Sequence, residues 1–470
     1  MEVKIIDKWQ DSDYGATNYL YDLGKGRKVI YTHKLGCNEC GVRILLKGGA
    51  LYEKQLGLPL GTAHFLEHML CRPNLVLKTQ EEIDLFCFGT KDFPAIYNFA
   101  YTTDQILCFG VDTHVLGYKR AIAFLSYIMN YPKELFNKNI EEERKVILAE
   151  LGRYPSERKN EALEFNKFIL EGKYKRYYKR TLGDKNNILD ITTKDLEVLW
   201  DEIKKNKSVV ISVQSGTKPS VKMINEFGIL FDNVYDGNFK GNTRFYKIEN
   251  KFKVGYYKDE KVQNIGLEIG VLRQKERMKR YNIKSYRKTI LSVIAERVIS
   301  FLLHKRLRDE NHLVYEVNSF NSYITTDWIA HGIYTNFEKG LESEVLKNIW
   351  ETLYGIDNAP SYELFLNSDI GKQWLEHEIS KSIFVMNINF DKAYSENIGY
   401  IIACDTFPYK FDKDFVKNNV IKKITPQDVV TFINEELSSK QPYLWIKHNT
   451  SRSEIMQRME IAIKQISINF

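Results

Sequence analysis

Cysteine and proline are scarce in this sequence, which has 6 cysteines and 10 prolines among 470 residues. So few and so scattered cysteines exclude a disulfide-stapled scaffold. So little proline excludes a collagen-like or proline-rich disordered chain. No apolar run approaches the roughly 18–20 residues that a membrane-spanning helix requires. These absences predict a folded protein without a transmembrane segment.

The first residues also lack the features of a targeting segment. Residues 1–8 (MEVKIIDK) contain no apolar core of the kind found in signal peptides. They include two acidic residues, whereas organellar transit peptides are poor in acidic residues. Together with the small number of cysteines, this start predicts a reducing compartment, the cytoplasm.

Charge of one sign is in only slight excess. The 68 Lys and Arg residues exceed the 61 Asp and Glu residues by a net charge of +7, and no long basic run concentrates that excess. A nucleic-acid-binding surface would need such a concentration. We therefore expect no nucleic-acid partner, and the missing apolar spans predict no membrane partner.

Apolar residues are plentiful, at 43% of the chain with 13% aromatics, so large cores can form. A single core stops growing at about 250–300 residues, so at least two domains are expected. Strands and helices alternate in the pattern throughout. The clearest strands are residues 41–50 and 104–111, and the clearest helices are residues 114–130, 134–158 and 290–303.

A weak internal repeat indicates a duplicated domain. Ile191–Leu196 (ITTKDL) is echoed by Ile424–Val429 (ITPQDV), about half the chain later. Each places a Thr three residues before an Asp ahead of an apolar-periodic run, which is a capping-box-like helix start. Strand-like runs then follow both helices, at residues 208–213 and 443–446. We expect domains at residues 1–235 and 251–470, joined by a polar, glycine-containing linker at residues 236–250.

The strongest chemical signal is the segment Gly61–Leu70 (GTAHFLEHML). His64 and His68 are four residues apart, so on a helix both imidazoles project from one face and can bind one Zn²⁺. Glu67 lies beside them and can act as a general base toward a water molecule. The alternative is a pair of surface histidines, or one core histidine that Glu67 satisfies. A catalytic zinc also needs a third protein ligand and an open position.

This H-x-x-E-H pattern, the inverse of H-E-x-x-H, resembles the pitrilysin/insulinase family. The similarity is greatest to its half-length branch, which includes mitochondrial processing peptidase and bacterial insulinase-like peptidases. In that family a downstream helix with two glutamates seven apart completes the metal site, and this chain offers Glu143 and Glu150. The resemblance implies that Glu150 is the third ligand and that Glu143 is a carboxylate that steadies the site. Glu141 and Glu142 are the alternative ligands.

A second segment with family character is Arg308–Tyr315 (RDENHLVY). Relatives carry an Arg and a Tyr at this spacing in their second domain. The resemblance implies that Arg308 holds a substrate carbonyl and that Tyr315 stabilises the oxyanion of the tetrahedral intermediate. The alternative is a solvated Arg at a helix end and a half-buried Tyr. Asn311-His312 stands where relatives often have Arg-Gly, so the local turn is expected to differ.

A third segment is Tyr97–Thr103 (YNFAYTT), where relatives have an Asn-Ala-aromatic-Thr strand whose edge pairs with substrate. The resemblance implies that Asn98 and Ala100 contact an extended peptide by β-augmentation. Phe99 separates these two residues here, so the Asn is shifted or the strand is bulged. An ordinary core strand fits the pattern equally well.

Cysteines near these segments have ordinary alternatives. Cys37 and Cys40 form a lone C-x-x-C without a second pair, which fits a turn before a strand better than a redox or metal role. Cys71, three residues after His68, fits buried packing better than metal binding.

The resemblance covers most of the chain and implies an α+β protein. Its two similar domains would each be an antiparallel-rich sheet backed by helices, and they would face each other across a chamber. It implies a zinc metalloendopeptidase or processing peptidase with one Zn²⁺ per chain, acting on short or unfolded peptides such as leader or targeting peptides. A homodimer, or a heterodimer with a related subunit, is compatible with the family. The alternative function is a non-catalytic peptide-binding or partner subunit of a heteromeric peptidase.

Overall fold

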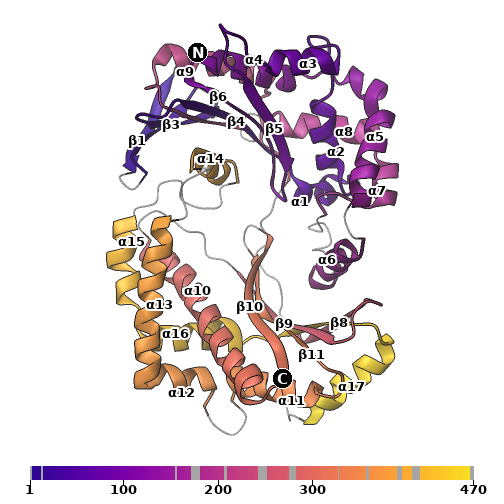
Figure 1. Ribbon diagram of the computed structural model, residues 1–470, viewed down its shortest axis with the longest axis vertical. Helices are drawn as coiled ribbons and strands as arrows, with labels where there is room; N and C mark the ends of the chain where they lie inside the picture. The colour runs from indigo at the N-terminus through magenta and orange to yellow at the C-terminus, as the bar shows by residue number, and fades with distance from the viewer. Residues whose placement is uncertain are drawn as a thin grey trace. The chain divides into compact units, whose positions relative to one another are not determined.

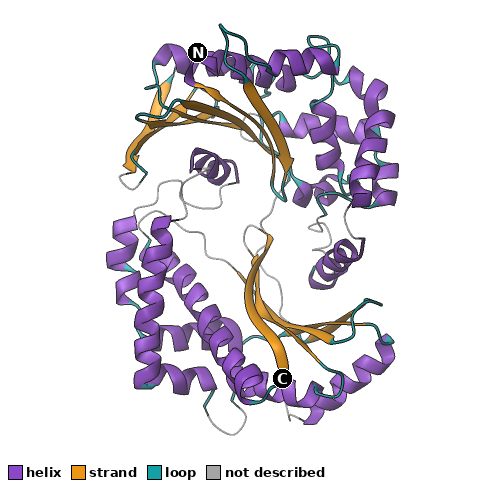
Figure 2. Ribbon diagram, in the orientation of Figure 1, coloured by secondary structure: helices purple, strands orange, loops and turns teal. Residues whose placement is uncertain are grey.

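Two β-sheets organise the chain in the computed structural model (Figures 1 and 2). The structure describes residues 3–11, 14–153, 156–170, 180–205, 209–241, 251–274, 282–325, 328–355, 359–388, 394–404 and 413–465. The chain divides into two compact units. Unit 1 comprises Met1–Ser156, Leu170–Thr243 and Asn389–Lys410, and unit 2 comprises Glu157–Ile169, Arg244–Ile388 and Phe411–Phe470.

The sheet of unit 1 has the strand order β1-β2-β3-β7-β4-β6-β5. Every neighbouring pair is antiparallel except β3 with β7, which is parallel. The strands are β1 (Lys4–Asp11), β2 (Ala16–Asp22), β3 (Lys28–Lys34), β4 (Glu39–Lys47), β5 (Ile96–Thr102), β6 (Ile106–His114) and β7 (Val209–Ser215).

The sheet of unit 2 has the order β10-β11-β9-β12-β8, again antiparallel except for one parallel pair, β12 with β8. Its strands are β8 (Lys253–Lys258), β9 (Ile265–Gln274), β10 (Val314–Thr325), β11 (Trp328–Phe337) and β12 (Tyr443–His448). The five strands β5-β6-β4-β7-β3 of the first sheet follow one another in the same order, relative to the chain, as β10-β11-β9-β12-β8 of the second. In both sheets the parallel pair is the last one in this order. The two units are therefore copies of one fold, with β1 and β2 added to the first.

In the first half of the chain, the first two helices are α1 (Ala50–Glu53) and the short α2 (Thr62–Leu70) (Figure 1). The others are α3 (Gln80–Cys87), α4 (Tyr118–Met129), α5 (Glu134–Arg153), α6 (Ser156–Ile169), α7 (Lys185–Asp190), α8 (Thr193–Ile203) and α9 (Val221–Glu226). One large apolar core joins the sheet of unit 1 to α2, α4 and α8, with Phe65, Phe109 and Trp200 fully buried in it.

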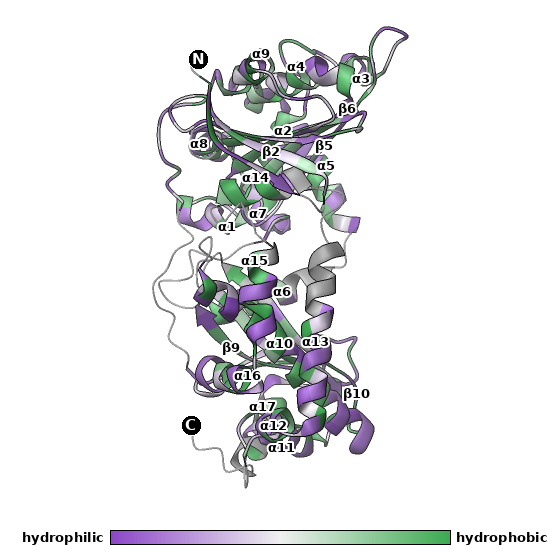
Figure 3. Ribbon diagram, turned by 90° about the vertical axis from the view of Figure 1, so that its left-hand side faces the viewer, coloured by the Kyte–Doolittle hydropathy of each residue, from purple (hydrophilic) through white to green (hydrophobic). Residues whose placement is uncertain are grey.

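The helices of the second half begin with the long α10 (Ile283–Leu303), which continues into a π-helical segment, His304–Glu310. The others are α11 (Glu342–Leu353), α12 (Ser361–Asn367), α13 (Asp369–Ile388), α14 (Tyr394–Cys404), α15 (Lys413–Asn419), α16 (Pro426–Ile433) and α17 (Arg452–Gln465). Most helices carry both hydrophobic and hydrophilic residues along their length (Figure 3). The apolar residues of α10, α11 and α16 form a second core with the sheet of unit 2.

Helices α8 and α16 begin at the two copies of the predicted repeat. The Thr192 side chain accepts a hydrogen bond from the Asp195 N–H, and the Asp195 carboxylate accepts one from the Thr192 N–H, at 2.8 Å. Thr425 and Asp428 form the same capping box, with Pro426 at the first helical position. The following strands, β7 and β12, occupy equivalent places in the two sheets. The predicted α+β class, with two similar antiparallel-rich sheets backed by helices, is confirmed.

Each unit also contains one helix from the other half of the chain. Helix α14 packs against β7, β4 and β3 in unit 1, where Ile398 and Cys404 are buried and Glu396 forms an ion pair with Arg43, at 3.1 Å (Figure 1). In unit 2, rings of α6 lie against Tyr443 and Trp445 of β12. The contiguous domains expected from the sequence do not include this exchange.

Other boundaries differ from the sequence prediction by a few residues. The helix expected over 134–158 is two helices, because α5 ends at Arg153 and α6 begins at Ser156. Of the predicted linker, residues 242–250 lie outside the described residues. Among the described helices, none is both long enough and apolar enough to cross a membrane.

Candidate metal centre

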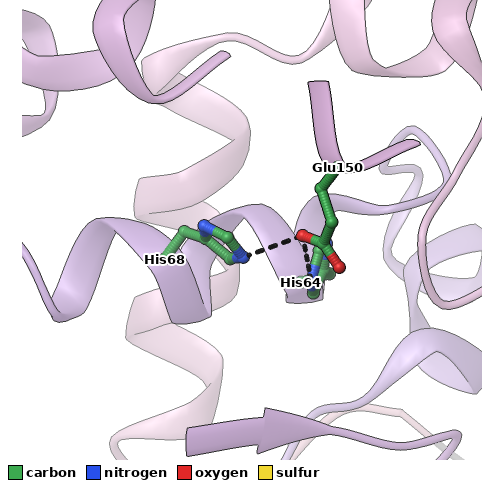
Figure 4. A group of neighbouring side chains, drawn as sticks. All are labelled: His64, His68 and Glu150. Carbon is green, nitrogen blue, oxygen red and sulfur yellow. Dashed lines mark ion pairs between the residues drawn. The ribbon is translucent and has the colours of Figure 1, made fainter. Parts of the chain in front are cut away.

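Helix α2 presents both motif histidines on one side (Figure 4). The His64 and His68 rings lie with their centroids 4.6 Å apart and their planes at 71°. The remaining faces of α2 are apolar, and Phe65, Leu66 and Met69 are fully buried in the core of unit 1. The sequence therefore fixes the rotation of α2, because burying these three residues turns the imidazoles to the opposite side.

Glu150 of α5 points toward both imidazoles (Figure 4). Its Oε2 atom lies 3.6 Å from the Nε2 atom of His64 and 3.4 Å from the Nε2 atom of His68. One ligand atom from each of the three residues lies within 4.8 Å of the others. The alternative ligands point elsewhere: Glu141 pairs with Arg144, and Glu142 pairs with Arg72.

Glu143 orients His68. Its Oε1 atom lies 2.8 Å from the Nδ1 atom of His68, and Arg72 approaches its other oxygen at 3.3 Å. In the neutral imidazole a carboxylate at Nδ1 holds the proton on that nitrogen, so that Nε2, which faces Glu150, is the nitrogen available to a metal. Burial lowers the pKa of His68, but the hydrogen bond and the charge of Glu143 outweigh that effect, so the pKa is raised.

Glu67 lies on α2 between the histidines, and only 8% of its surface is exposed. Its Oε2 atom accepts a hydrogen bond of 2.7 Å from the hydroxyl of Thr102, at the end of β5. Burial raises the pKa of Glu67, and the charge of Glu150 adds to this, whereas Thr102 and His68 oppose it. A buried carboxylate with a raised pKa beside two imidazoles is suited to taking up a proton.

Glu53 is a residue of this site that the sequence analysis missed. It is fully buried, and its two carboxylate oxygens accept hydrogen bonds from the N–H groups of Gly61, at 2.9 Å, and Ala63, at 2.8 Å. These donors are at the N-terminus of α2, where a negative charge is favoured. Gly61 has φ +90°, and a Cβ atom there would lie 2.9 Å from the Ile188 side chain and 3.0 Å from the backbone of Gly183, so this position favours glycine. The sequence offers no clear signal for it, because Lys54 and Gln55 follow Glu53 directly, as on a solvated segment.

Arg144 is a second missed residue, and it holds α5 in place. Its guanidinium is buried and donates hydrogen bonds to the carbonyl groups of Ile188, within α7, and of Ile191, which directly follows α7, the latter at 2.9 Å. The guanidinium carbon also lies 5.4 Å from the centre of the Phe65 ring. Nothing in its sequence context distinguishes it from a solvated helix Arg.

Strand β5 ends the sheet of unit 1 beside α2. It pairs with β6 in one continuous register from Ile96 to Thr102, so the bulge considered for this strand is absent. Asn98, Ala100 and Thr102 alternate with Phe99 and Tyr101, whose rings stack in parallel on the opposite face. Asn98 and Ala100 thus share the face of the strand that carries Thr102 toward Glu67.

Arg308 and Tyr315 come together within unit 2. The Arg308 guanidinium lies 5.2 Å from the centre of the Tyr315 ring, and Tyr315 is 81% exposed. His312 between them adopts φ +54°, the left-handed conformation that favours glycine. His64, His68 and Glu150 belong to unit 1, so the participation of this pair in one site with them stays a prediction.

None of the six cysteines forms a disulfide, and all six are within the described residues. Cys71 is not part of the metal-ligand cluster, and burial raises its pKa to about 12. Burial likewise raises the pKa of Cys40 to about 12, so this thiol of the C-x-x-C segment stays protonated.

No protein-family model and no curated protein sequence matches this chain. Solved structures do. The periplasmic protease PqqL from Escherichia coli superposes with a TM-score of 0.73 at 12% identity, over 98% of this chain and 51% of PqqL. A peptidase M16 inactive domain from Pseudomonas fluorescens gives 0.66 at 14% identity, over 92% and 98% of the two chains. A protease from Helicobacter pylori gives 0.65 at 16% identity, over 93% and 100%.

These similarities establish the fold. The chain has the two-sheet α+β fold found in M16 peptidases, and it spans about half the length of PqqL. The same fold occurs in proteases and in an inactive domain, so the fold alone does not decide activity.

The position of Glu53 predicts a pH-dependent stability. Burial raises the pKa of Glu53 from its ordinary 4.5 to about 8, although the two N–H donors oppose the rise. The folded protein therefore binds this proton more tightly than the unfolded chain, so stability falls as the pH rises from about 5 to about 8. Relative to Glu53→Gln, the wild type should lose on the order of 4 kcal/mol over this window, measured by urea unfolding in a pH series.

Glu260→Gln is the control for this measurement. Glu260 pairs with Lys258, which lowers its pKa, so its contribution is already complete at pH 5 and should not change up to pH 8. A wild-type curve parallel to that of Glu53→Gln would mean that Glu53 is ionised in the folded protein throughout.

Proposed function

We propose that this protein is a zinc-dependent endopeptidase or processing peptidase of the pitrilysin/insulinase family, with one Zn²⁺ per chain. The observation that carries this proposal is the convergence of His64, His68 and Glu150 within 4.8 Å, next to the buried carboxylate of Glu67. The fold shared with M16 peptidases supports the same family.

The donor set fits a catalytic zinc. Two imidazole nitrogens and one carboxylate oxygen are the ligands of catalytic zinc in several peptidases, and they leave a fourth position open. Glu143 supplies the carboxylate that commonly supports a zinc-bound imidazole. A structural zinc would instead be closed by a fourth protein ligand, and Cys71, the nearest thiol in sequence, is not among the converging groups.

When bound, zinc would polarise the scissile carbonyl and lower the pKa of water at this site. Glu67 is the general base: it takes a proton from the attacking water and later delivers it to the leaving amine. Its carboxylate lies close enough to His68 and Glu150 for their charges to act on its pKa, which puts the base beside the three proposed ligands. Glu143 holds the His68 ring, and so acts on the reaction through this imidazole rather than directly.

The substrate in this proposal is an extended peptide that adds to the outer edge of β5, the last strand of its sheet. Asn98 and Ala100 would contact it on the face that leads to Glu67. Arg308 would hold a substrate carbonyl, and the exposed Tyr315 would stabilise the oxyanion. Pairing through the backbone accepts many sequences, which suits short or unfolded peptides such as leader or targeting peptides.

A non-catalytic role is the second candidate, because an inactive M16 domain has this fold. In that case the chain would bind peptides or partner an active subunit. The chain spans about half of PqqL, so a second copy or a related subunit belongs to the proposal in either form. The complete His-His-Glu set with Glu67 favours the catalytic candidate. A cytoplasmic location stays a prediction.

Glu150→Gln tests the metal site. Replacing the carboxylate removes the anionic ligand, so zinc affinity should fall by about 100-fold or more while the fold is kept. The measurement is zinc content after dialysis against a chelator series, with unfolding curves for both proteins. Glu142→Gln, on the same helix, is the control and should retain zinc. Equal zinc retention by Glu150→Gln would move the ligand to another residue.

Glu67→Gln separates metal binding from catalysis. Gln keeps the size of the side chain but cannot take up a proton, so peptide cleavage should fall by about 10²–10⁴-fold with zinc content unchanged. A mixed peptide library, read by mass spectrometry with and without chelator, provides the assay. Zinc-loaded wild type that binds these peptides but cleaves none of them would support the non-catalytic subunit instead.

Tyr315→Phe tests the contribution of unit 2. Loss of one oxyanion donor should lower kcat by about 10²-fold, with KM and zinc content little changed. Tyr235→Phe removes the hydroxyl of another exposed tyrosine, on unit 1, and should cleave like the wild type. If the two variants were equally active, Tyr315 would have no part in the mechanism.

A further inference from the structure

The carboxylate of Glu67 is held from outside its own helix by a single side chain. The hydroxyl of Thr102 donates a hydrogen bond to Oε2 of Glu67, at 2.7 Å. Among the residues that the structure describes, Thr102 is the only hydrogen-bond donor to this carboxylate. The Oε2 atom is thus bound by a residue of β5, and this hydrogen bond restrains the rotation of the carboxylate about the Cγ–Cδ bond.

Thr102 is itself rigidly placed. It pairs with Leu107 at the end of the β5–β6 ladder. The next residue, Thr103, closes the turn by donating its N–H to the carbonyl of Ile106, at 2.9 Å, and its own carbonyl accepts from the N–H of Ala50, at 3.2 Å. The branched side chain of threonine also restricts χ1. The donor therefore stays in one place while the Glu67 side chain, with its three rotatable bonds, would otherwise move.

We propose that Thr102 is a positioning residue for the general base: it binds one oxygen of Glu67 so that the other is presented to the attacking water. Glu67 is the base in the proposed function, on which this inference rests. The hydroxyl suits this task because it donates to the carboxylate whether Glu67 carries a proton or not. Thr102 acts on Glu67 and not on the proposed zinc ligands. Glu143 contacts His68, and Glu150 lies against both histidines.

The chain offers a matched set of variants. Thr102→Val keeps the shape of the side chain and removes the donor, whereas Thr102→Ser keeps the donor and loses a methyl group. Thr113→Val is the control, because Thr113 is a buried threonine of the neighbouring strand β6 whose hydroxyl donates to the carbonyl of Ala95, at 2.7 Å, away from Glu67. If replacing any buried threonine hydroxyl in this sheet lowers activity or stability, Thr113→Val will show the same loss as Thr102→Val.

Steady-state cleavage of a peptide by the zinc-loaded protein is the first measurement. Thr102→Val should lower kcat by about 10- to 100-fold, the range found when a supporting partner in a metal site is lost, with KM and zinc content unchanged. Thr102→Ser should recover most of the turnover, and Thr113→Val should match the wild type. Wild-type kcat in Thr102→Val, or an equal loss in Thr113→Val, would overturn the positioning role. Absence of cleavage by the wild type would instead contradict the proposed function.

Crystals of the metal-free proteins provide a readout that does not depend on activity. The Glu67 carboxylate should keep its orientation in the wild type and in Thr102→Ser, and should turn away from β5 or occupy several rotamers in Thr102→Val. An unchanged orientation of Glu67 in Thr102→Val would overturn the inference whatever the activity of the enzyme.

Discussion

The hydrogen bond between His68 and Glu143 is the interaction on which the candidate metal centre depends. It joins α2 to α5 through residues 75 positions apart in the sequence, and it is partly buried. Glu150 lies two turns further along α5 and meets both imidazoles at 3.4–3.6 Å. A slip of α5 by one turn would move it about 5.4 Å, more than those distances, and would end the convergence. Two neighbouring residues fix the position of α5 along its axis. Glu143 binds His68 of α2, and Arg144 donates hydrogen bonds to the carbonyls of Ile188 and Ile191 at the end of α7.

The same region concentrates buried carboxyl groups around a short helix. Helix α2 has nine residues, too few to be stable alone, so it depends on its apolar face and on the groups at its ends. Glu53, Glu67 and Glu143 are all buried beside it, and each is compensated by its own donors: two backbone N–H groups, Thr102, and His68 with Arg72. Glu67 and Glu150 still repel each other. A divalent cation would relieve that repulsion, so binding of such a cation by the cluster is electrostatically favoured.

The sequence predicted the parts of this arrangement that follow from local spacing. Two histidines four apart predict a shared helix face, Thr192 and Thr425 predict helix starts, and family resemblance adds Glu143 and Glu150. The contribution of Glu53, Arg144 and Thr102 could not be predicted, because each acts on a residue that the fold brings near it. The exchange of α6 and α14 between the units was missed for the same reason: an apolar helix face does not say which sheet it will cover.

The two units have equivalent sheets but differ in the segments that connect the strands. Their strand orders are equivalent, and the segment between β4 and β5 corresponds by topology to the segment between β9 and β10. In unit 1 this segment is interrupted at Gly57 and Gly61, both with positive φ, which makes α2 a separate short helix whose N-terminus Glu53 can cap. In unit 2 the described part of this segment contains the continuous 21-residue α10. This helix has no such interruption and no His pair, and it leads instead to Arg308 and Tyr315. A break in one helix and a few buried carboxylates therefore separate a candidate metal centre from a candidate substrate-binding segment on the same framework.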